Sequence, residues 1–136
     1  MGSDAVERGL LLDTSVWFWY ALGDRRLRST LRTALDDAQP NLWLSPISIW
    51  ELGVLLRRGR IHLRQPFAAW VRTVLDRLPL RDAHMTREVA IATESLRLEH
   101  HDPADRVIAA TALAYRLQLA TSDRKLVAAD WLPTVS

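Results

Sequence analysis

The sequence predicts an α/β protein with a largely parallel sheet that helices cover on both faces. Short apolar runs of strand length alternate with helical patterns along the chain. Parallel strands need a crossover between them, usually a helix, so this alternation is typical of such folds. The 136 residues suffice for one hydrophobic core, and no repeat or linker divides them, so we expect a single domain over residues 1–136.

The first strand and the first helix follow each other directly. Leu10–Leu12 is an uninterrupted apolar run, which predicts a strand buried on both faces. Thr14 and Ser15 are residues that start helices, so we expect an aromatic-rich helix from Val16 to Leu22 that ends at Gly23.

A helix, a strand and another helix follow. Residues 25–38 carry leucines four positions apart, the spacing of an amphipathic helix, and a proline turn ends it. Residues 42–44 form the second strand. Ser45 then caps a helix over residues 46–58, which begins with a proline and which Gly59 terminates.

The second half of the chain repeats the alternation with a weaker pattern. Helical spacing of apolar residues, strand-like runs and proline breaks mark each element. The expected elements are a helix from Pro66 to just before Pro79, a weak strand over 78–83, a helix after Thr86, a helix from Pro103, a strand over 117–120, a helix over 123–129 and an edge strand over 132–135.

The composition is that of a soluble protein, for which a cytoplasmic location is the default. The hydrophobic fraction is 49% and the charged fraction 25%, and no apolar run approaches the ~18 residues of a membrane span. Met1-Gly2-Ser3-Asp4 lacks the pattern of a signal peptide. The absence of cysteine excludes disulfides and zinc-thiolate sites.

The basic residues are almost all arginine. Of the 18 basic residues only Lys125 is lysine, and the pI is near 9.7. Arginine's planar fork suits phosphate, so this bias fits an acidic partner such as nucleic acid. A genome's base composition produces the same bias, and we give that explanation the larger share.

Four acidic residues, far apart in sequence, each fall where a strand ends or a helix begins. In a parallel sheet such positions meet along one edge, so the four carboxylates are expected to converge on one hard cation. They are Asp13, Glu51, Asp105 and Asp123.

Each acid also has a purely structural explanation. Asp13 and Asp123 precede helices and can cap them, which taken alone is the commoner role of each. Asp102 is a natural cap before Pro103, and Asp105 at the third helical position complements the helix dipole. Glu51 resists this explanation, because it lies in the second turn among apolar neighbours, where an unpaired carboxylate is costly unless a metal offsets the cost.

Basic residues and histidines follow some of the acids. Arg106, Arg124 and Lys125 can hold an RNA backbone near a metal, although solvated helix ends are the commoner explanation. His100 and His101 precede Asp102, but a histidine pair in a loop is usually a surface or capping feature, and we assign it no role.

Taken in order, four motifs resemble those of the PIN-domain ribonucleases, and specifically of the VapC toxins of bacterial type II toxin-antitoxin pairs. Each motif alone is weak, but four at these spacings are specific, and together they cover nearly the whole chain. The motifs are Leu11-Leu12-Asp13-Thr14-Ser15, then Ser45-Pro46-Ile47-Ser48-Ile49-Trp50-Glu51-Leu52, then His101-Asp102-Pro103-Ala104-Asp105-Arg106 running into Ile108-Ala109-Ala110-Thr111-Ala112, and last Thr121-Ser122-Asp123.

The resemblance implies a fold and a site. It implies a three-layer α/β/α sandwich whose mostly parallel sheet of four to five strands has the order 3-2-1-4-5. The family's acidic quartet falls on Asp13, Glu51, Asp105 and Asp123, with Thr121 supporting the last acid and Asp102 as an outer or capping residue. It implies an endoribonuclease that uses Mg²⁺, or Mn²⁺, to hydrolyse RNA to a 5′-phosphate and a 3′-hydroxyl.

The resemblance also implies protein partners. Such toxins form homodimers, and heterotetramers or larger assemblies with a VapB-type antitoxin whose C-terminal segment fills a groove near the acids. We expect at least half of the candidate groove residues to belong to the core instead. The candidates are Trp17, Trp19, Tyr20, Leu27, Leu31 and Leu35.

Three other classes fit less well. A haloacid-dehalogenase-like phosphatase generally needs a second Asp two residues after the first, and Ser15 stands there. A receiver domain needs an acidic pair beside the first strand, whereas Asp36 and Asp37 lie late in a helix. The main alternative is a PIN-like module that binds RNA or protein without cleaving.

Overall fold

A five-stranded, wholly parallel sheet of order β3-β2-β1-β4-β5 forms the centre of the protein in a computed structural model that describes residues 8–98 and 102–136. The strands are β1 (Leu10–Leu12), β2 (Leu42–Leu44), β3 (Arg81–Asp82), β4 (Gln118–Ala120) and β5 (Thr134–Val135). The helices are α2 (Thr14–Leu22), α3 (Ser29–Ala38), α4 (Pro46–Arg57), α5 (Phe67–Arg77), α6 (Arg87–Ser95), α7 (Pro103–Tyr115) and α8 (Arg124–Ala128).

The sheet order and the alternation of strands with helices confirm the predicted fold. Strand β1 lies in the middle, with Leu11 in register with Trp43 of β2 on one side and Leu119 of β4 on the other. The backbone N–H of Asp13 donates to the carbonyl of Ala120 at 3.0 Å, so the segments that leave β1 and β4 stay side by side. The chain therefore delivers two predicted site segments to the same edge.

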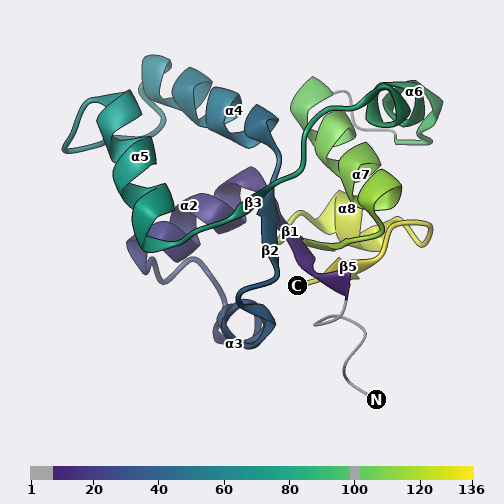
Figure 1. The fold of residues 1–136 in the computed structure, drawn as a ribbon, viewed down its shortest axis with the longest axis horizontal. Coiled ribbons are helices and arrows are strands. Elements are labelled where there is room, and N and C mark those ends of the chain that lie inside the picture. Colours follow the sequence, from purple (N-terminus) through teal and green to yellow (C-terminus); the bar gives the residue numbers. More distant parts are fainter. Residues whose placement is uncertain (1–7, 99–101) are drawn as a thin grey trace.

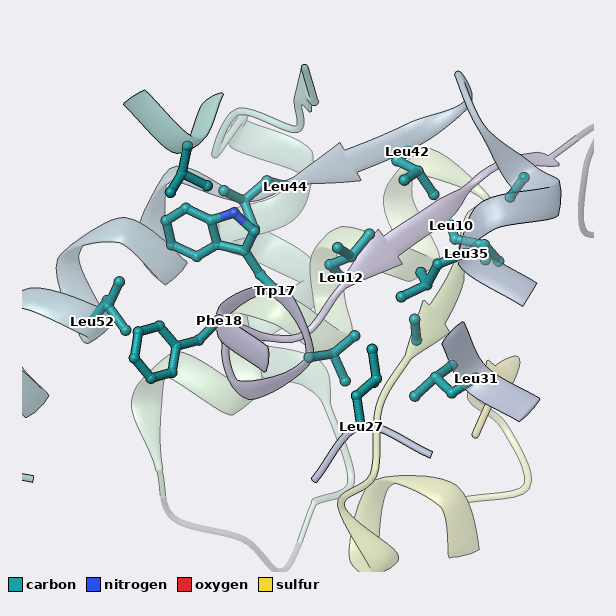
Figure 2. Close-up of a cluster of buried hydrophobic side chains, with 14 of the residues drawn as sticks. Leu10, Leu12, Trp17, Phe18, Leu27, Leu31, Leu35, Leu42, Leu44 and Leu52 are labelled. Atoms are coloured by element: carbon teal, nitrogen blue, oxygen red, sulfur yellow. The ribbon is translucent and has the colours of Figure 1, made fainter. Parts of the chain in front are cut away.

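Helices cover the sheet on both faces (Figure 1). Because successive side chains of a strand point to opposite faces, Leu10 and Leu12 pack with α2, α3, α4 and α5, whereas Leu11 packs with α7 and α8. Figure 2 shows part of the first cluster, with Trp17, Phe18 and Leu52 near one another. In this cluster the Trp17 and Trp70 rings meet edge to face, with ring centroids 5.8 Å apart. Two dry cores thus hold the central strand from both sides.

One predicted helix begins four residues later than expected. The Asp24 side chain accepts hydrogen bonds from the backbone N–H of Arg26 at 2.9 Å and from its guanidinium, which stabilises a turn instead of a helix. Arg28 is extended, with φ −60° and ψ 145°, and α3 begins at Ser29. Leu27 nevertheless packs in the core, which explains its helix-like position in the pattern.

The edges of the sheet are shorter than the sequence indicated. Only Arg81–Asp82 of the predicted strand over 78–83 pairs, while Leu78 and Leu80 pack against the core instead. At the opposite edge the predicted strand over 132–135 is reduced to Thr134–Val135. Within residues 8–98 and 102–136, no helix has the length and apolar character that crossing a membrane requires.

Candidate active site

A cavity of about 350 Å³ opens at the carboxyl edge of the sheet, where β1 and β4 end and α4 and α7 begin. All four predicted acids line it, together with Asp102, so five carboxylates from separate segments share one space. Its lining consists of Asp13, Thr14, Ser15, Trp19, Glu51, Leu55, Asp102, Asp105, Ser122 and Asp123.

Asp13 is the most deeply placed of these acids, with only 9% of its surface exposed. Its Oδ1 accepts the backbone N–H of Thr14 at 2.8 Å, and its Oδ2 accepts the hydroxyl of Thr121 at 2.7 Å. The Thr121 oxygen in turn accepts the backbone N–H of Asp123 at 3.0 Å. The predicted supporting residue Thr121 therefore links the first and the last acid of the motif series.

Glu51 projects from the second turn of α4. Ser45 caps this helix, accepting the backbone N–H of Ile47 at 3.2 Å, and Glu51 lies beyond the reach of that cap. One turn earlier, the hydroxyl of Ser48 accepts a hydrogen bond from the Thr14 hydroxyl at 2.9 Å, and both side chains are buried. This contact fixes α4 against the start of α2 and so sets where Glu51 enters the cavity.

Asp102 and Asp105 come from the first turn of α7. Asp102 caps the helix, accepting the backbone N–H of Ala104 at 2.9 Å. Carboxylate oxygens of Glu51, Asp102 and Asp105 all lie within 4.8 Å of one another. Asp102 was expected only to support the site or cap the helix, whereas the structure places it beside Glu51 and Asp105, two of the four predicted ligands.

Asp123 also combines a structural role with a place in the cavity. Its Oδ1 accepts the backbone N–H groups of Lys125 at 2.8 Å and of Leu126 at 3.2 Å, which caps α8. Asp123 can therefore cap a helix and line the site at the same time, because a carboxylate has enough lone pairs for both roles.

Burial, together with repulsion from neighbouring carboxylates, raises the pKa of Asp13, Glu51 and Asp105. Desolvation, followed by repulsion from Asp13, Asp102, Glu51 and Asp123, raises the pKa of Asp105 to about 7. Desolvation likewise raises the pKa of Asp13, against the hydrogen bonds from Thr121 and Thr14. For Glu51, desolvation is again the main cause of a raised pKa, and the polar side chain of Thr14 opposes it.

The donor set fits a hard divalent cation. An octahedral ion with ligands at ~2.0 to 2.1 Å separates neighbouring oxygens by about 3 Å and opposite ones by about 4 Å. Carboxylate oxygens of Glu51, Asp102 and Asp105 lie within 4.8 Å of one another, so a small closure would bring them to that spacing, and Asp13 and Asp123 line the same cavity. A cation would also offset the repulsion between these carboxylates.

The predicted basic residues differ in position. The Arg106 guanidinium donates to the backbone carbonyl of Thr93 at 2.7 Å, so this side chain joins α7 to α6 and does not line the cavity. Arg124 and Lys125 are exposed at the start of α8, next to Asp123. His100 and His101 lie outside the described residues.

Most of the side chains expected in a partner groove belong to the core instead. Trp17, Leu27, Leu31 and Leu35 are at most 3% exposed, because β1 and β2 pack against them, so these four are core residues, in line with the expectation that at least half of the six are core. Trp19 lies in the acidic cavity and stacks under the guanidinium of Arg26 at 5.4 Å.

Two features of the site could not be predicted from the sequence. The buried Thr14–Ser48 contact joins residues 34 positions apart, and only the folded chain reveals it. Ser15, Leu55 and Ser122 line the cavity although they carry no charge that would single them out. Their motif neighbours were the only available signal.

Comparison with known proteins agrees with this architecture. The PIN domain family model matches residues 10–132. Ribonuclease VapC22 of Mycobacterium tuberculosis is 33% identical over 118 residues, which cover 86% of this chain and 88% of that protein. The protein therefore belongs to the PIN domain family. Within that family it is a ribonuclease of the VapC type.

Solved structures share the fold. A toxin-antitoxin complex from Klebsiella pneumoniae has a chain that superposes with a TM-score of 0.66 at 22% identity, covering 94% of this chain and 97% of that one. A DNA-bound VapBC structure from Salmonella typhimurium gives a TM-score of 0.67 at 20% identity, covering 93% and 96% of the two chains.

Proposed function

We propose that this VapC-type endoribonuclease hydrolyses RNA with Mg²⁺ held by the acidic cavity, and that it acts in the cytoplasm as the toxin of a pair with a VapB-type antitoxin. The observation that carries the proposal is the convergence of five carboxylates on one cavity, three of them with raised pKa values. Such a cluster costs stability, and a cation-binding function accounts for it.

In the proposed mechanism the acids divide the work. Asp105, Glu51 and Asp102 would hold the cation, with Asp13 and Asp123 completing the site. The bound cation supplies charge neutralisation at the scissile phosphate and lowers the pKa of a water. Glu51, with its raised pKa, is suited to orient that water and accept its proton. Thr121 holds Asp13 and Asp123 in place through its hydroxyl.

The antitoxin is the proposed protein partner. The solved relatives include toxin-antitoxin complexes, which supports a partner of this kind for the present chain. A second cavity of about 180 Å³ adjoins the acidic one and shares Thr14, Ser15, Trp19 and Leu55 with it. With Phe18, Ile61 and Arg60 in its lining, this cavity suits an apolar segment that carries an acidic residue. A homodimer that binds two antitoxin chains completes the proposal.

The decisive experiment is cleavage of a defined mixture of tRNA, ribosomal RNA and messenger RNA by antitoxin-free protein. We expect cuts with Mg²⁺ that EDTA prevents and that are lost in Asp13→Asn and Asp105→Asn. The matched control is Asp76→Asn, which removes an exposed carboxylate on α5. That variant should cut like the wild type.

Other outcomes would contradict the proposal. RNA binding without cuts in either Mg²⁺ or Mn²⁺ would indicate a non-cleaving module. Cuts that persist in EDTA and in both site variants would show that the acidic cavity is not the catalytic centre.

A further inference from the structure

A third cavity, of about 220 Å³, lies behind the acidic one and shares Ser122 with it. We call it the α8 cavity. Two arginines reach it from different segments: Arg28 precedes α3, and Arg124 is the first residue of α8. Its lining consists of Arg28, Ser122, Arg124, Val127, Ala128 and Ser136.

The side chains of the α8 cavity are basic, hydroxylic or apolar, in contrast to the carboxylates next door. Arg28 and Arg124 are both exposed, and within residues 8–98 and 102–136 neither guanidinium forms a hydrogen bond or an ion pair. Arg26 and Arg106, by comparison, are already engaged with Asp24 and Thr93.

The cavity matches one nucleotide in chemistry. Arginine's fork binds phosphate oxygens with two parallel N–H groups, and two arginines provide this twice. Val127, which is 40% exposed, and Ala128 form an apolar wall on which a ribose or a base can lie. Ser122, exposed between the two cavities, adds a hydroxyl where the chain of nucleotides would pass from one to the other.

We propose that the α8 cavity binds the phosphate of an RNA nucleotide that flanks the scissile phosphodiester, with Arg28 and Arg124 as its ligands. The inference rests on the proposed function, since it names where the RNA substrate is held. Five carboxylates repel a polyanion, so affinity for RNA has to come from cations at neighbouring phosphates. The α8 cavity supplies two such cations, Arg28 and Arg124, and it adjoins the acidic cavity through Ser122, which lines both.

The test compares the wild type with the double variant Arg28→Ala/Arg124→Ala. The Arg28 side chain caps nothing in α3, and alanine is a good helix former at the start of α8, so the variant should fold. The control Arg72→Ala removes an exposed arginine from α5. A second variant, Arg28→Lys/Arg124→Lys, keeps both positive charges and removes only the planar guanidinium groups that bind phosphate through two N–H groups.

The first readout is fluorescence anisotropy of a labelled single-stranded RNA in EDTA, where the proposed cleavage stops. We expect the double alanine variant to bind about tenfold more weakly, with a slope of log affinity against log salt smaller by about 0.7, the loss of one phosphate contact. The lysine variant should keep the slope and lose part of the affinity. Equal affinity and slope in the wild type, Arg72→Ala and the double alanine variant would overturn the inference.

The second readout is cleavage of RNA oligonucleotides in which single phosphates are replaced by neutral methylphosphonates. In the wild type, neutralising one flanking linkage should lower kcat/KM about tenfold, and in the double alanine variant it should cost nothing further. Equal losses in both proteins would overturn the inference.

These results separate the two proposals. If the wild type cleaves RNA but the arginine substitutions change neither RNA binding nor the methylphosphonate pattern, only the proposal for the α8 cavity is refuted. RNA binding that depends on the arginines without any cleavage refutes the nuclease proposal alone. No RNA binding at all refutes both.

Discussion

Thr121 illustrates how one small side chain organises the site. It is fully buried, and its hydroxyl donates to Asp13 while accepting from the backbone N–H of Asp123. An isosteric valine fills the same volume without either hydrogen bond. The loss of unfolding free energy in this variant therefore measures the two hydrogen bonds and not the creation of a cavity.

We expect Thr121→Val to lower the free energy of unfolding by about 1 to 3 kcal/mol, the cost of leaving buried polar groups without partners. Urea unfolding measures this directly. Thr121→Ser retains the hydroxyl and should recover more than half of the loss. A valine variant as stable as the wild type would show that water replaces the hydroxyl.

The raised pKa of Asp105 predicts how pH affects the metal-free protein. The pKa of Asp105 is about 7 in the folded protein, whereas the ordinary value for an aspartate, which applies to the unfolded chain, is 3.8. Between these values the folded protein binds the proton and the unfolded chain does not. Folding is therefore stabilised at the acidic end of this window, and the stability is lost as the pH rises toward 7.

We expect the Tm in EDTA to fall between pH 5 and pH 8, and Asp105→Asn to flatten that decline. Cation binding requires the ionised carboxylate, so Mg²⁺ affinity should rise over the same interval, with proton release detectable by calorimetry in buffers of different ionisation enthalpy. A wild-type Tm that rises through this interval would contradict the assignment.

At the scale of secondary-structure elements, the end of α7 provides a separate test of local physics. Arg116 adopts the left-handed conformation, with φ 56°, which glycine accepts at less cost than arginine. Arg116→Gly should raise the free energy of unfolding by about 0.5 to 1 kcal/mol.

Gly23 at the end of α2 is the reciprocal control. It has φ 65°, and a Cβ built there meets nothing within 4 Å, so Gly23→Ala changes only the backbone preference. We expect a loss of about 1 kcal/mol. Effects of the same sign in both variants would mean that contacts other than backbone conformation decide these helix ends.

The elements also show what could be read from the sequence. Uninterrupted leucines at β1 and the Ser45-Pro46 start of α4 depend on local rules, and both elements appear where predicted. The predicted start of α3 is wrong because the side chain of Asp24 stabilises a turn that competes with the first turn of the helix. The convergence of the acids followed from parallel topology, whereas the place of Asp102 among them required three-dimensional distances.

At the scale of the whole molecule, the proposed cation site predicts that cation binding increases stability. Mg²⁺ at a hundred times its dissociation constant stabilises the folded state by about 2.7 kcal/mol, roughly 10 °C in Tm for a protein of this size. We expect this shift in the wild type and in Asp76→Asn, and its loss in Asp105→Asn. A Tm that Mg²⁺ leaves unchanged would contradict the cation site.

The Thr121–Asp13 hydrogen bond joins residues 108 positions apart. During synthesis Thr121 is added 108 residues after Asp13, so the partner of this carboxylate emerges much later. Because non-local contacts form after the segments that they join are available, an unfinished chain lacks the organised acids. The proposed cation site is therefore absent from nascent chains and from chains that terminate before Thr121, because the buried partner of Asp13 is missing from them.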